Sequence, residues 1–307
     1  MNDLLIIGGG PAGMTAAVYA ARKKLKMLMV SPEIGGQAAW APEVENYLGF
    51  SMITGDELVS KFEQHVRDFG VETIVSKVVR LRRDGLTFVS EVSDGREIES
   101  RTVLVATGRS ARNLGVPGEE AYKGRGVAYC ATCDAPLFSD ENVAVVGGGN
   151  AGLSAALQLS RVAKHVYLIE DRPKLTSDQV LQDRAAVAGN VTVLVSSHVE
   201  EICGGAMVEG IVVTDASSGE RRKIPVTGVF IEIGSVPNTG FLPQELALTE
   251  YGEIVIDCSN HTSLPGLFAA GDATTVTHKQ IIIAAGEGAK GVLSAYDYLL
   301  RTSPEAV

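Results

Sequence analysis

The sequence predicts an α/β protein of two three-layer domains, the second inserted in the first, and three observations support this prediction. Residues 4–13 form an apolar run that leads into a G-x-G-x-x-G turn, and residues 143–152 repeat the pattern. Each copy continues into a small-residue helix and a second apolar strand. Further apolar strands ending in small turns lie outside the second copy, at residues 101–108 and 266–272. Such a repeat is typical of two Rossmann-like dinucleotide-binding domains.

The elements are expected in the order strand, helix, strand in each copy, followed by a long C-terminal helix. Their ranges are 4–7, 14–22 and 27–30, then 143–146, 153–162 and 166–169, and finally 280–300. Pro117 with Gly118, and residues 240–243, have the Pro/Gly-rich composition of exposed links between domains. We therefore assign residues 1–113 with 244–307 to one domain and residues 114–243 to the other.

The glycines of each turn have separate physical tasks. The first permits a tight turn, the second lets the backbone approach a pyrophosphate, and the third lets the helix pack on the strand. The phosphates then lie at a helix N-terminus, where free N–H groups and the helix dipole favour negative charge. The expected residues are Gly8, Gly10 and Gly13 in the first copy and Gly147, Gly149 and Gly152 in the second.

The residue that closes the second strand of such a unit usually determines which ribose is held. That residue is Ser31 in the first copy and Glu170 in the second. Glu170 offers the expected carboxylate to a ribose 2′-hydroxyl. In the first copy, Glu33 lies two residues after Ser31 and is within reach of the same task.

Four cysteines are too few for a disulfide scaffold. Cys203 and Cys258 stand alone and are expected to be buried, inert thiols. Cys130 and Cys133 form a C-x-x-C, which in a reducing compartment indicates a catalytic or metal-binding pair. No second C-x-x-C or H-x₃₋₅-H completes a zinc site, so we expect a redox dithiol and no metal. Asp134 follows directly and can hand a proton to the leaving thiolate.

Composition places the chain among soluble globular proteins. Of its 307 residues, 45% are hydrophobic and 21% charged, and the net charge of −10 argues against a nucleic-acid surface. The N-terminus lacks the basic region of a signal peptide, and no apolar stretch approaches the roughly 18 residues of a membrane span. We therefore expect a cytoplasmic protein that contacts neither membrane nor nucleic acid.

The quoted motifs carry a family resemblance over the whole chain. Residues 8–13, 35–37, 43–46, 106–108, 130–134 and 271–272 resemble those of low-molecular-weight thioredoxin reductases. Residues 134–138, 178–183, 237–239 and 279–283 are closer to the reductase portion of the flavoprotein component of alkyl hydroperoxide reductase. Since the sequence begins at the first predicted strand, we do not expect that protein's additional N-terminal thioredoxin-fold module.

The resemblance implies FAD in the first domain, a nicotinamide dinucleotide in the inserted domain, and a homodimer. The implied FAD contacts, beyond the glycine turn and Glu33, are Pro11, Ala12, Gly36, Gln37, Asn46, Ala106, Thr107, Gly108, Gly271, Asp272, Lys279, Gln280 and Ile281. The implied contacts of the nicotinamide dinucleotide, beyond the second glycine turn and Glu170, are Asn150 and Gly234. Asp272 is implied to contact the ribityl or phosphate part, and Gln280 the pyrimidine end of the isoalloxazine.

The resemblance also implies an order of events. Cys133 faces the flavin, and Cys130 attacks a partner disulfide to give a mixed disulfide that Cys133 resolves. The partner is then a thioredoxin, a glutaredoxin-like protein or a peroxiredoxin-linked carrier. Rotation of the inserted domain on its two linkers would present dithiol and nicotinamide to the flavin in turn. NADPH-using relatives have a His-Arg-Arg cluster where this chain has Glu170, Asp171 and Arg172, so we expect NADH to be preferred over NADPH.

Two alternatives keep FAD and the C-x-x-C. A dithiol oxidase would pass electrons to oxygen, and a ferredoxin-driven reductase would not draw them from a nicotinamide. In either, the nicotinamide motif is expected to decay, whereas Gly147, Gly149, Gly152 and Glu170 are intact. A redox sensor that binds nucleotides without turnover would have no need of Asp134 beside the dithiol.

Overall fold

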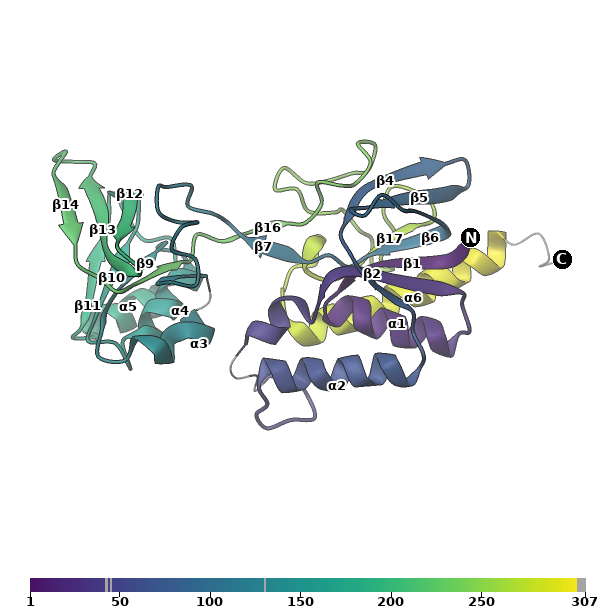
Figure 1. The fold of residues 1–307 in the computed structure, drawn as a ribbon, viewed down its shortest axis with the longest axis horizontal. Coiled ribbons are helices and arrows are strands. Elements are labelled where there is room, and N and C mark those ends of the chain that lie inside the picture. The colour runs from purple at the N-terminus through teal and green to yellow at the C-terminus, as the bar shows by residue number, and fades with distance from the viewer. Residues whose placement is uncertain (42–43, 45, 130, 303–307) are drawn as a thin grey trace. The chain divides into compact units, whose positions relative to one another are not determined.

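The fold is given by a computed structural model, which describes residues 1–41, 44, 46–129 and 131–302. The side chains of Trp40, Thr132 and Cys133 are not described. The chain divides into two compact units, Met1–Ser110 with Val236–Val307, and Ala111–Ser235 (Figure 1). These are called the outer unit and the inserted unit below.

The crossings between the units lie at 110/111 and 235/236, and not at 113/114 and 243/244 as expected. The larger difference has a packing cause. The Phe241 carbonyl accepts a hydrogen bond from the Leu81 N–H at 2.8 Å, and Phe241 and Leu242 pack against the outer unit's core. The Pro/Gly-rich stretch 240–243 is therefore a surface turn of the outer unit rather than a link.

The outer unit is built on a seven-stranded sheet in the order β3-β2-β1-β6-β5-β4, with β17 paired to β6. Its strands are β1 (Asn2–Gly9), β2 (Met27–Ile34), β3 (Thr73–Val75), β4 (Val78–Asp84), β5 (Thr87–Val92), β6 (Glu97–Val105) and β17 (Leu267–Ala269). Its helices are α1 (Pro11–Arg22), α2 (Gly55–Asp68) and α6 (Ile281–Thr302), with 3-10 turns η1 (Gly36–Trp40) and η3 (Gly271–Ala273).

The inserted unit has a five-stranded parallel sheet in the order β11-β10-β9-β15-β8 and a three-stranded antiparallel sheet β12-β13-β14. The parallel strands are β8 (Val127–Ala128), β9 (Asn142–Val146), β10 (His165–Ile169), β11 (Val191–Leu194) and β15 (Gly228–Ile231). The others are β12 (Ser197–Gly204), β13 (Val208–Asp215) and β14 (Arg221–Ile224). The helices are α3 (Ala131–Asp134), η2 (Ala135–Phe138), α4 (Asn150–Leu159) and α5 (Gln179–Val187).

The chain passes between the units through β7 (Arg109–Ala111) and β16 (Ser235–Pro237), which pair as a two-stranded sheet. Both links therefore run side by side (Figure 1).

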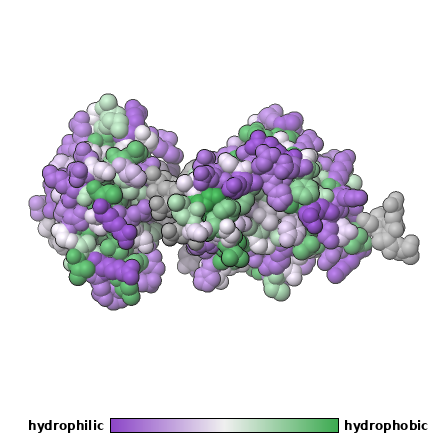
Figure 2. Space-filling model, turned by 90° about the horizontal axis from the view of Figure 1, so that it is seen from below, coloured by the Kyte–Doolittle hydropathy of each residue, from purple (hydrophilic) through white to green (hydrophobic). Residues whose placement is uncertain are grey.

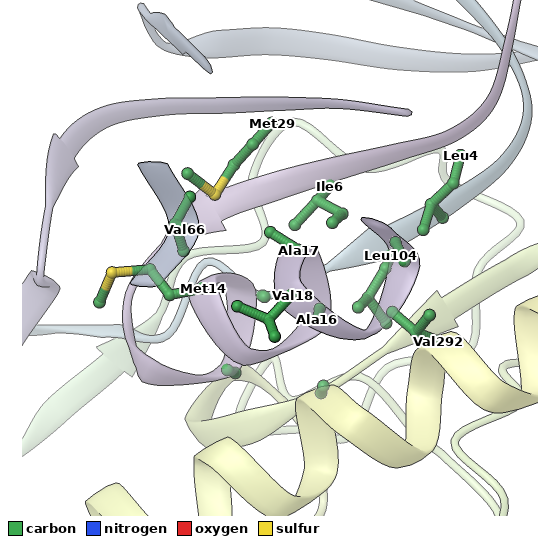
Figure 3. Packing of buried hydrophobic residues seen from close by; sticks show 14 of the residues in the cluster. Leu4, Ile6, Met14, Ala16, Ala17, Val18, Met29, Val66, Leu104 and Val292 are labelled. Atoms are coloured by element: carbon green, nitrogen blue, oxygen red, sulfur yellow. The ribbon is translucent and has the colours of Figure 1, made fainter. Parts of the chain in front are cut away.

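Three layers in the outer unit follow from the alternation of side chains along β1. Leu4 and Ile6 belong to the core cluster shared with α1 and α6, which Figure 3 shows from close by. Leu5 and Ile7 belong to the cluster on the opposite face, under β4 and β5. All four side chains are almost fully buried. Burying one such side chain contributes roughly 1.5–3 kcal/mol, so covering both faces holds the strand rigidly in the sheet.

The inserted unit repeats this arrangement on β9. Val143 and Val145 pack with α4, while Ala144 and Val146 pack under the antiparallel strands β12 to β14. Each unit is thus a helical layer, a largely parallel sheet and a β layer, which confirms the predicted α/β class with two Rossmann-like domains. The helix expected at 153–162 lies three residues earlier, since α4 begins at Asn150 and ends at Leu159.

The surface is mixed in polarity. On the face drawn in Figure 2, hydrophilic residues predominate and hydrophobic residues occur in small groups. Among the described residues, no helix combines the length and the apolar character needed to cross a bilayer.

Candidate active site

The first glycine turn lies at the carboxyl end of β1. A Cβ on Gly8 would come within 2.2 Å of the Ala106 carbonyl oxygen, and one on Gly13 within 1.8 Å of the Gly8 carbonyl oxygen. Gly8 also has a φ of +119°, which favours glycine. These two positions are therefore fixed by close packing of backbone on backbone.

Gly10 differs, because a Cβ there would meet no protein atom nearer than 4.0 Å. It caps α1, whose first turn has Pro11 and receives no side-chain hydrogen bond at the cap. The N–H groups of this turn and the open side of Gly10 leave a cradle that fits a pyrophosphate. This observation supports a dinucleotide at the outer unit's turn.

Other expected FAD residues gather around this turn. The Ala106 N–H donates to the Ile7 carbonyl at 2.7 Å, so the segment after β6 lies against β1. A Cβ on Gly36 would lie 3.6 Å from Gly10 Cα, and one on Gly271 would lie 3.2 Å from Ala12 Cβ. The end of β2, which carries the exposed side chain of Glu33, also borders the turn, since the Glu33 carbonyl lies within 2.8 Å of a Cβ built on Gly9.

The residues expected near the isoalloxazine come from distant parts of the chain. Asn46 Nδ2 donates to Gln280 Oε1 at 2.9 Å, although 234 positions separate them. Gln280 immediately precedes α6, and its carbonyl accepts the Ala284 N–H. Gln37 donates to the Arg109 carbonyl. Ile281, the first residue of α6, packs against the core beneath α2.

A charged cluster that the sequence did not reveal lies close by. Glu253 Oε1 accepts from Arg109 at 2.8 Å and from Lys279 Nζ at 3.2 Å, with all three side chains at most about a quarter exposed. Burial raises the pKa of Asp272, while Lys279 and Arg109 lower it. Lys279 is thus an ion-pair partner of Glu253 as well as a neighbour of Asp272.

The turn after β6 is held by a loop that follows β16. Thr107 Oγ1 donates to the Asn238 carbonyl at 2.8 Å, and Asn238 Nδ2 donates to the Thr107 carbonyl at 2.9 Å. The Gly108 carbonyl accepts the Asn238 N–H at 3.0 Å, with Gly108 at a φ of +62°. Thr107 and Gly108 are therefore positioned by Asn238.

The inserted unit has an equivalent turn at the carboxyl end of β9. A Cβ on Gly147 would lie 2.4 Å from the Glu232 carbonyl oxygen, and one on Gly152 would lie 1.8 Å from the Gly147 carbonyl oxygen. Gly149 is the open position, with Thr176 Oγ1 the nearest atom at 3.8 Å. It caps α4 without a side-chain hydrogen bond. The second turn therefore also fits a pyrophosphate.

Glu170 is buried at the end of β10 and holds two backbone groups. Its Oε2 accepts the Gly148 N–H at 2.6 Å and its Oε1 accepts the Arg172 N–H at 2.9 Å. Burial raises the pKa of this carboxyl, and Asp171 raises it further. In the outer unit, Ser31 takes the same place, because its Oγ accepts the Gly9 N–H at 2.9 Å.

Two more residues were expected at the nicotinamide site, Asn150 at the second turn and Gly234 two residues after Glu232. Asn150 opens α4 and exchanges hydrogen bonds with Asp178, whose N–H donates to Asn150 Oδ1 at 2.7 Å. Gly234 has a φ of +93°, and its carbonyl accepts the Arg112 N–H at 2.9 Å. Asp178 was not expected from the sequence.

The dithiol segment is described in part. Cys130 lies outside the described residues, and the Cys133 side chain does as well, although its backbone belongs to α3. At the end of α3, Asp134 is half-buried and burial raises its pKa.

The single cysteines differ from expectation, since Cys258 is exposed and Cys203 only half-buried. In the described part of the chain, no three or more His, Cys, Asp or Glu side chains cluster in a way that could hold a metal ion.

Two dinucleotide turns, one of them in the unit that also carries a C-x-x-C, define an oxidoreductase that works with two dinucleotides. Residues 2–288 match the model of the pyridine nucleotide-disulphide oxidoreductases, and the chain belongs to this family. The family uses FAD and NAD(P)H.

Relatives and solved structures agree with this assignment. The chain is 43% identical to the alkyl hydroperoxide reductase (F subunit) of Xanthomonas campestris pv. phaseoli, over 99% of this chain and 58% of that protein. It is 42% identical to an NADH dehydrogenase of Bacillus subtilis, over 97% of this chain and 59% of that protein. The chain thus spans about three-fifths of these relatives. Thioredoxin reductase of Lactococcus lactis matches with a TM-score of 0.85 and 34% identity, over 98% of this chain and 100% of that one.

Gly149, the open glycine of the second turn, allows a direct test of whether a pyrophosphate binds there. In the Gly149→Ala variant we expect the KM for the nicotinamide dinucleotide to rise about tenfold or more, because the added methyl group points into the pyrophosphate cradle. The fold should be unaffected, since the backbone at Gly149 (φ −84°, ψ −175°) is extended and suits alanine. Steady-state kinetics and a melting curve measure the two effects.

Gly189→Ala is the matched control, because Gly189 is exposed in the same unit and a Cβ there meets nothing within 4 Å. An unchanged KM in Gly149→Ala would show that the phosphates do not lie at this turn.

Proposed function

We propose that the chain is an NADH-dependent flavoprotein that reduces a thioredoxin-like protein disulfide through Cys130 and Cys133. One observation carries the proposal: the unit that holds the second nucleotide turn also holds the C-x-x-C, followed by an acid whose burial favours its protonated form. The names of the relatives, alkyl hydroperoxide reductase and NADH dehydrogenase, support NADH as the donor.

When bound, FAD would supply the two-electron redox chemistry that links a nicotinamide to the disulfide. The outer unit's contribution is positioning. The α1 N-terminus and the Gly10 cradle would hold the pyrophosphate, and Asn46 with Gln280 would lie at the isoalloxazine. Gln280 stands just before α6, where the positive end of the helix dipole favours negative charge on the ring system.

In this proposal the inserted unit binds the electron donor and supplies a proton to the dithiol. Asn150, Gly149 and Glu170 would hold the dinucleotide at its pyrophosphate and ribose. Asp134, as a protonated acid, would deliver a proton to the thiolate that leaves when the disulfide opens. Cys130, once its thiol has lost this proton again, then attacks a protein disulfide, and Cys133 releases the reduced product.

Three finer points belong to this proposal. The partner is a thioredoxin, a glutaredoxin-like protein or a peroxiredoxin-linked carrier, in keeping with the relatives' names. The inserted unit would turn on β7 and β16 between its two tasks. The active form would be a homodimer.

An anaerobic titration tests the proposal. Addition of NADH should bleach the yellow flavin, and a thioredoxin-like disulfide should restore the colour. A flavin that NADH leaves oxidised would instead favour a ferredoxin-driven reductase, for which a solved example from Clostridium acetobutylicum matches with 30% identity and a TM-score of 0.55. A flavin that oxygen reoxidises at full catalytic rate without a protein partner would favour a dithiol oxidase.

NADH should be preferred over NADPH by about one to two orders of magnitude in kcat/KM. Beyond the N–H groups of Gly148 and Arg172, the buried Glu170 carboxylate has lone pairs for ribose hydroxyls. A 2′-phosphate would bring like charges together, at about 4 kcal/mol per pair before screening for 4 Å and an effective dielectric of about 20. Arg172 and Lys174 offset part of this repulsion.

Measurement of kcat/KM with both donors decides the matter. Glu170→His combined with Asp171→Arg should move the preference towards NADPH, whereas Glu220→Gln, an exposed glutamate of the same unit, should not. A wild-type preference for NADPH would remove Glu170 from the ribose site.

A further inference from the structure

Glu232 is a half-buried carboxyl that the proposed mechanism leaves unused. It follows β15 directly, at the carboxyl end of the parallel sheet where the second nucleotide turn also lies. Its backbone is fixed on both sides. The Glu232 N–H donates to the Val146 carbonyl at 2.8 Å, and its own carbonyl lies against Gly147. The side chain therefore starts from a rigid point.

The Glu232 side chain reaches the dithiol segment. Its Oε1 accepts a long hydrogen bond, 3.4 Å, from the N–H of Ala131. That N–H belongs to the peptide group that links Cys130 to Ala131, and Cys133 follows two residues later. Hence Glu232 is bonded to the backbone between the two cysteines.

Ionisable neighbours of Glu232 are few in the described residues. The elements around it are β15, β9, β8 and α3, and of these α3 has the ionisable residues, Asp134 and the dithiol residue Cys133. Beyond β8 follows Tyr129, whose hydroxyl donates to Glu119. Burial raises the pKa of Glu232 to about 7, and the Ala131 N–H lowers it in part. The carboxyl is then neutral in mild acid and charged in mild base.

We propose that Glu232 is a positioning residue for the dithiol, whose carboxyl holds the peptide between the cysteines and, by losing its proton, opposes negative charge on the reduced pair. The inference rests on the proposed function. Two electrons break the S–S bond, and the two sulfurs take up two protons when both become thiols. Asp134 supplies one of these protons. With Glu232 neutral, the other sulfur can remain a thiolate; with Glu232 charged, repulsion disfavours that thiolate and with it the reduced form.

The sign of the pH effect follows from this balance. Below about pH 6, Glu232 carries no charge and a glutamine in its place should change little. Above about pH 8, the wild-type carboxylate opposes the thiolate, whereas glutamine does not. The equilibrium constant for dithiol formation in Glu232→Gln should therefore exceed the wild-type value by about tenfold at pH 8.5 and agree within about twofold at pH 6.

The experiment equilibrates the FAD-loaded protein with dithiothreitol buffers between pH 6 and 8.5 and counts protein thiols at each ratio. Glu232→Gln keeps an acceptor for the Ala131 N–H, and Glu220→Gln is the control at an exposed glutamate. Glu232→Ala, which lacks the acceptor, should differ from the wild type at every pH. Curves for Glu232→Gln that superimpose on the wild type over the whole range would overturn the inference.

Failure of the proposed function and failure of the role of Glu232 give different results in this experiment. If the wild-type protein itself has no dithiol that NADH can reduce, the function is wrong and the inference falls with it. If NADH reduces the dithiol normally and only the Glu232→Gln curves coincide with the wild type, the function stands and the role of Glu232 is refuted.

Discussion

Serine in place of Cys130 or Cys133 is expected to abolish disulfide reduction, by about 10³-fold or more, while FAD stays bound. The nucleophile and its resolving partner are both required, since a lone thiol can form a mixed disulfide but cannot complete the exchange. FAD should remain because neither cysteine lies in a glycine turn. NADH should still bleach the flavin in both variants, since hydride transfer does not pass through sulfur. Turnover with a protein disulfide and anaerobic spectra measure the two halves separately.

Cys258→Ser is the control for the loss of a thiol as such, because Cys258 is exposed and lies in the outer unit. Turnover that survives in either Cys130→Ser or Cys133→Ser would mean that this C-x-x-C does not relay the electrons. In Cys133→Ser, the remaining Cys130 should trap the protein partner as a stable mixed disulfide, which identifies it.

Replacement of Asp134 by Asn should slow the reoxidation of the flavin by the disulfide about 10²–10⁴-fold. The acid acts in its protonated form, and burial raises its pKa, so the protonated fraction extends to higher pH than for an exposed aspartate. In the wild type the rate should therefore fall as pH rises through this raised pKa. In Asp134→Asn the slow rate should show no such fall. Stopped-flow traces of the two half-reactions provide the measurement.

Reduction of the flavin by NADH should be nearly unchanged in Asp134→Asn, which serves as an internal control. Equal slowing of both half-reactions would assign Asp134 to the structure of the segment and not to proton transfer.

The sequence predicts well whatever depends on local pattern. Both glycine turns, their flanking strands and their helices lie where the apolar runs and glycine spacing place them, because backbone contacts such as Gly13 against Gly8 leave few alternatives. The antiparallel layers, β4 with β5 and β12 to β14, were not assigned. They are hairpins of strands that follow one another along the chain, and polar residues interrupt the apolar runs by which the other strands were found.

Local sequence pattern also fails to reveal which charged residues of the site lie close together. Glu253 and Glu232 are ordinary glutamates in the sequence, and only the fold brings one to Arg109 and Lys279 and the other to Ala131. One signal was available for Glu232: a carboxylate directly after an apolar strand, at the edge where parallel strands end, is a frequent site position. Cys258 was expected to be buried and is exposed, since a lone cysteine carries no pattern that reports its surroundings.

The matched positions of Ser31 and Glu170 give the two turns different electrostatics on a shared backbone. Each side chain accepts the N–H of the middle glycine, one as a neutral hydroxyl and the other as a carboxyl. In the outer unit nothing at this position opposes the positive end of α1, which favours a long residence time for a doubly charged pyrophosphate. In the inserted unit a carboxylate would offset part of that field while holding the ribose, which would favour rapid exchange. Under the proposed function, a retained cofactor and an exchanging donor would thus use the same backbone turn, with this side chain contributing to the difference.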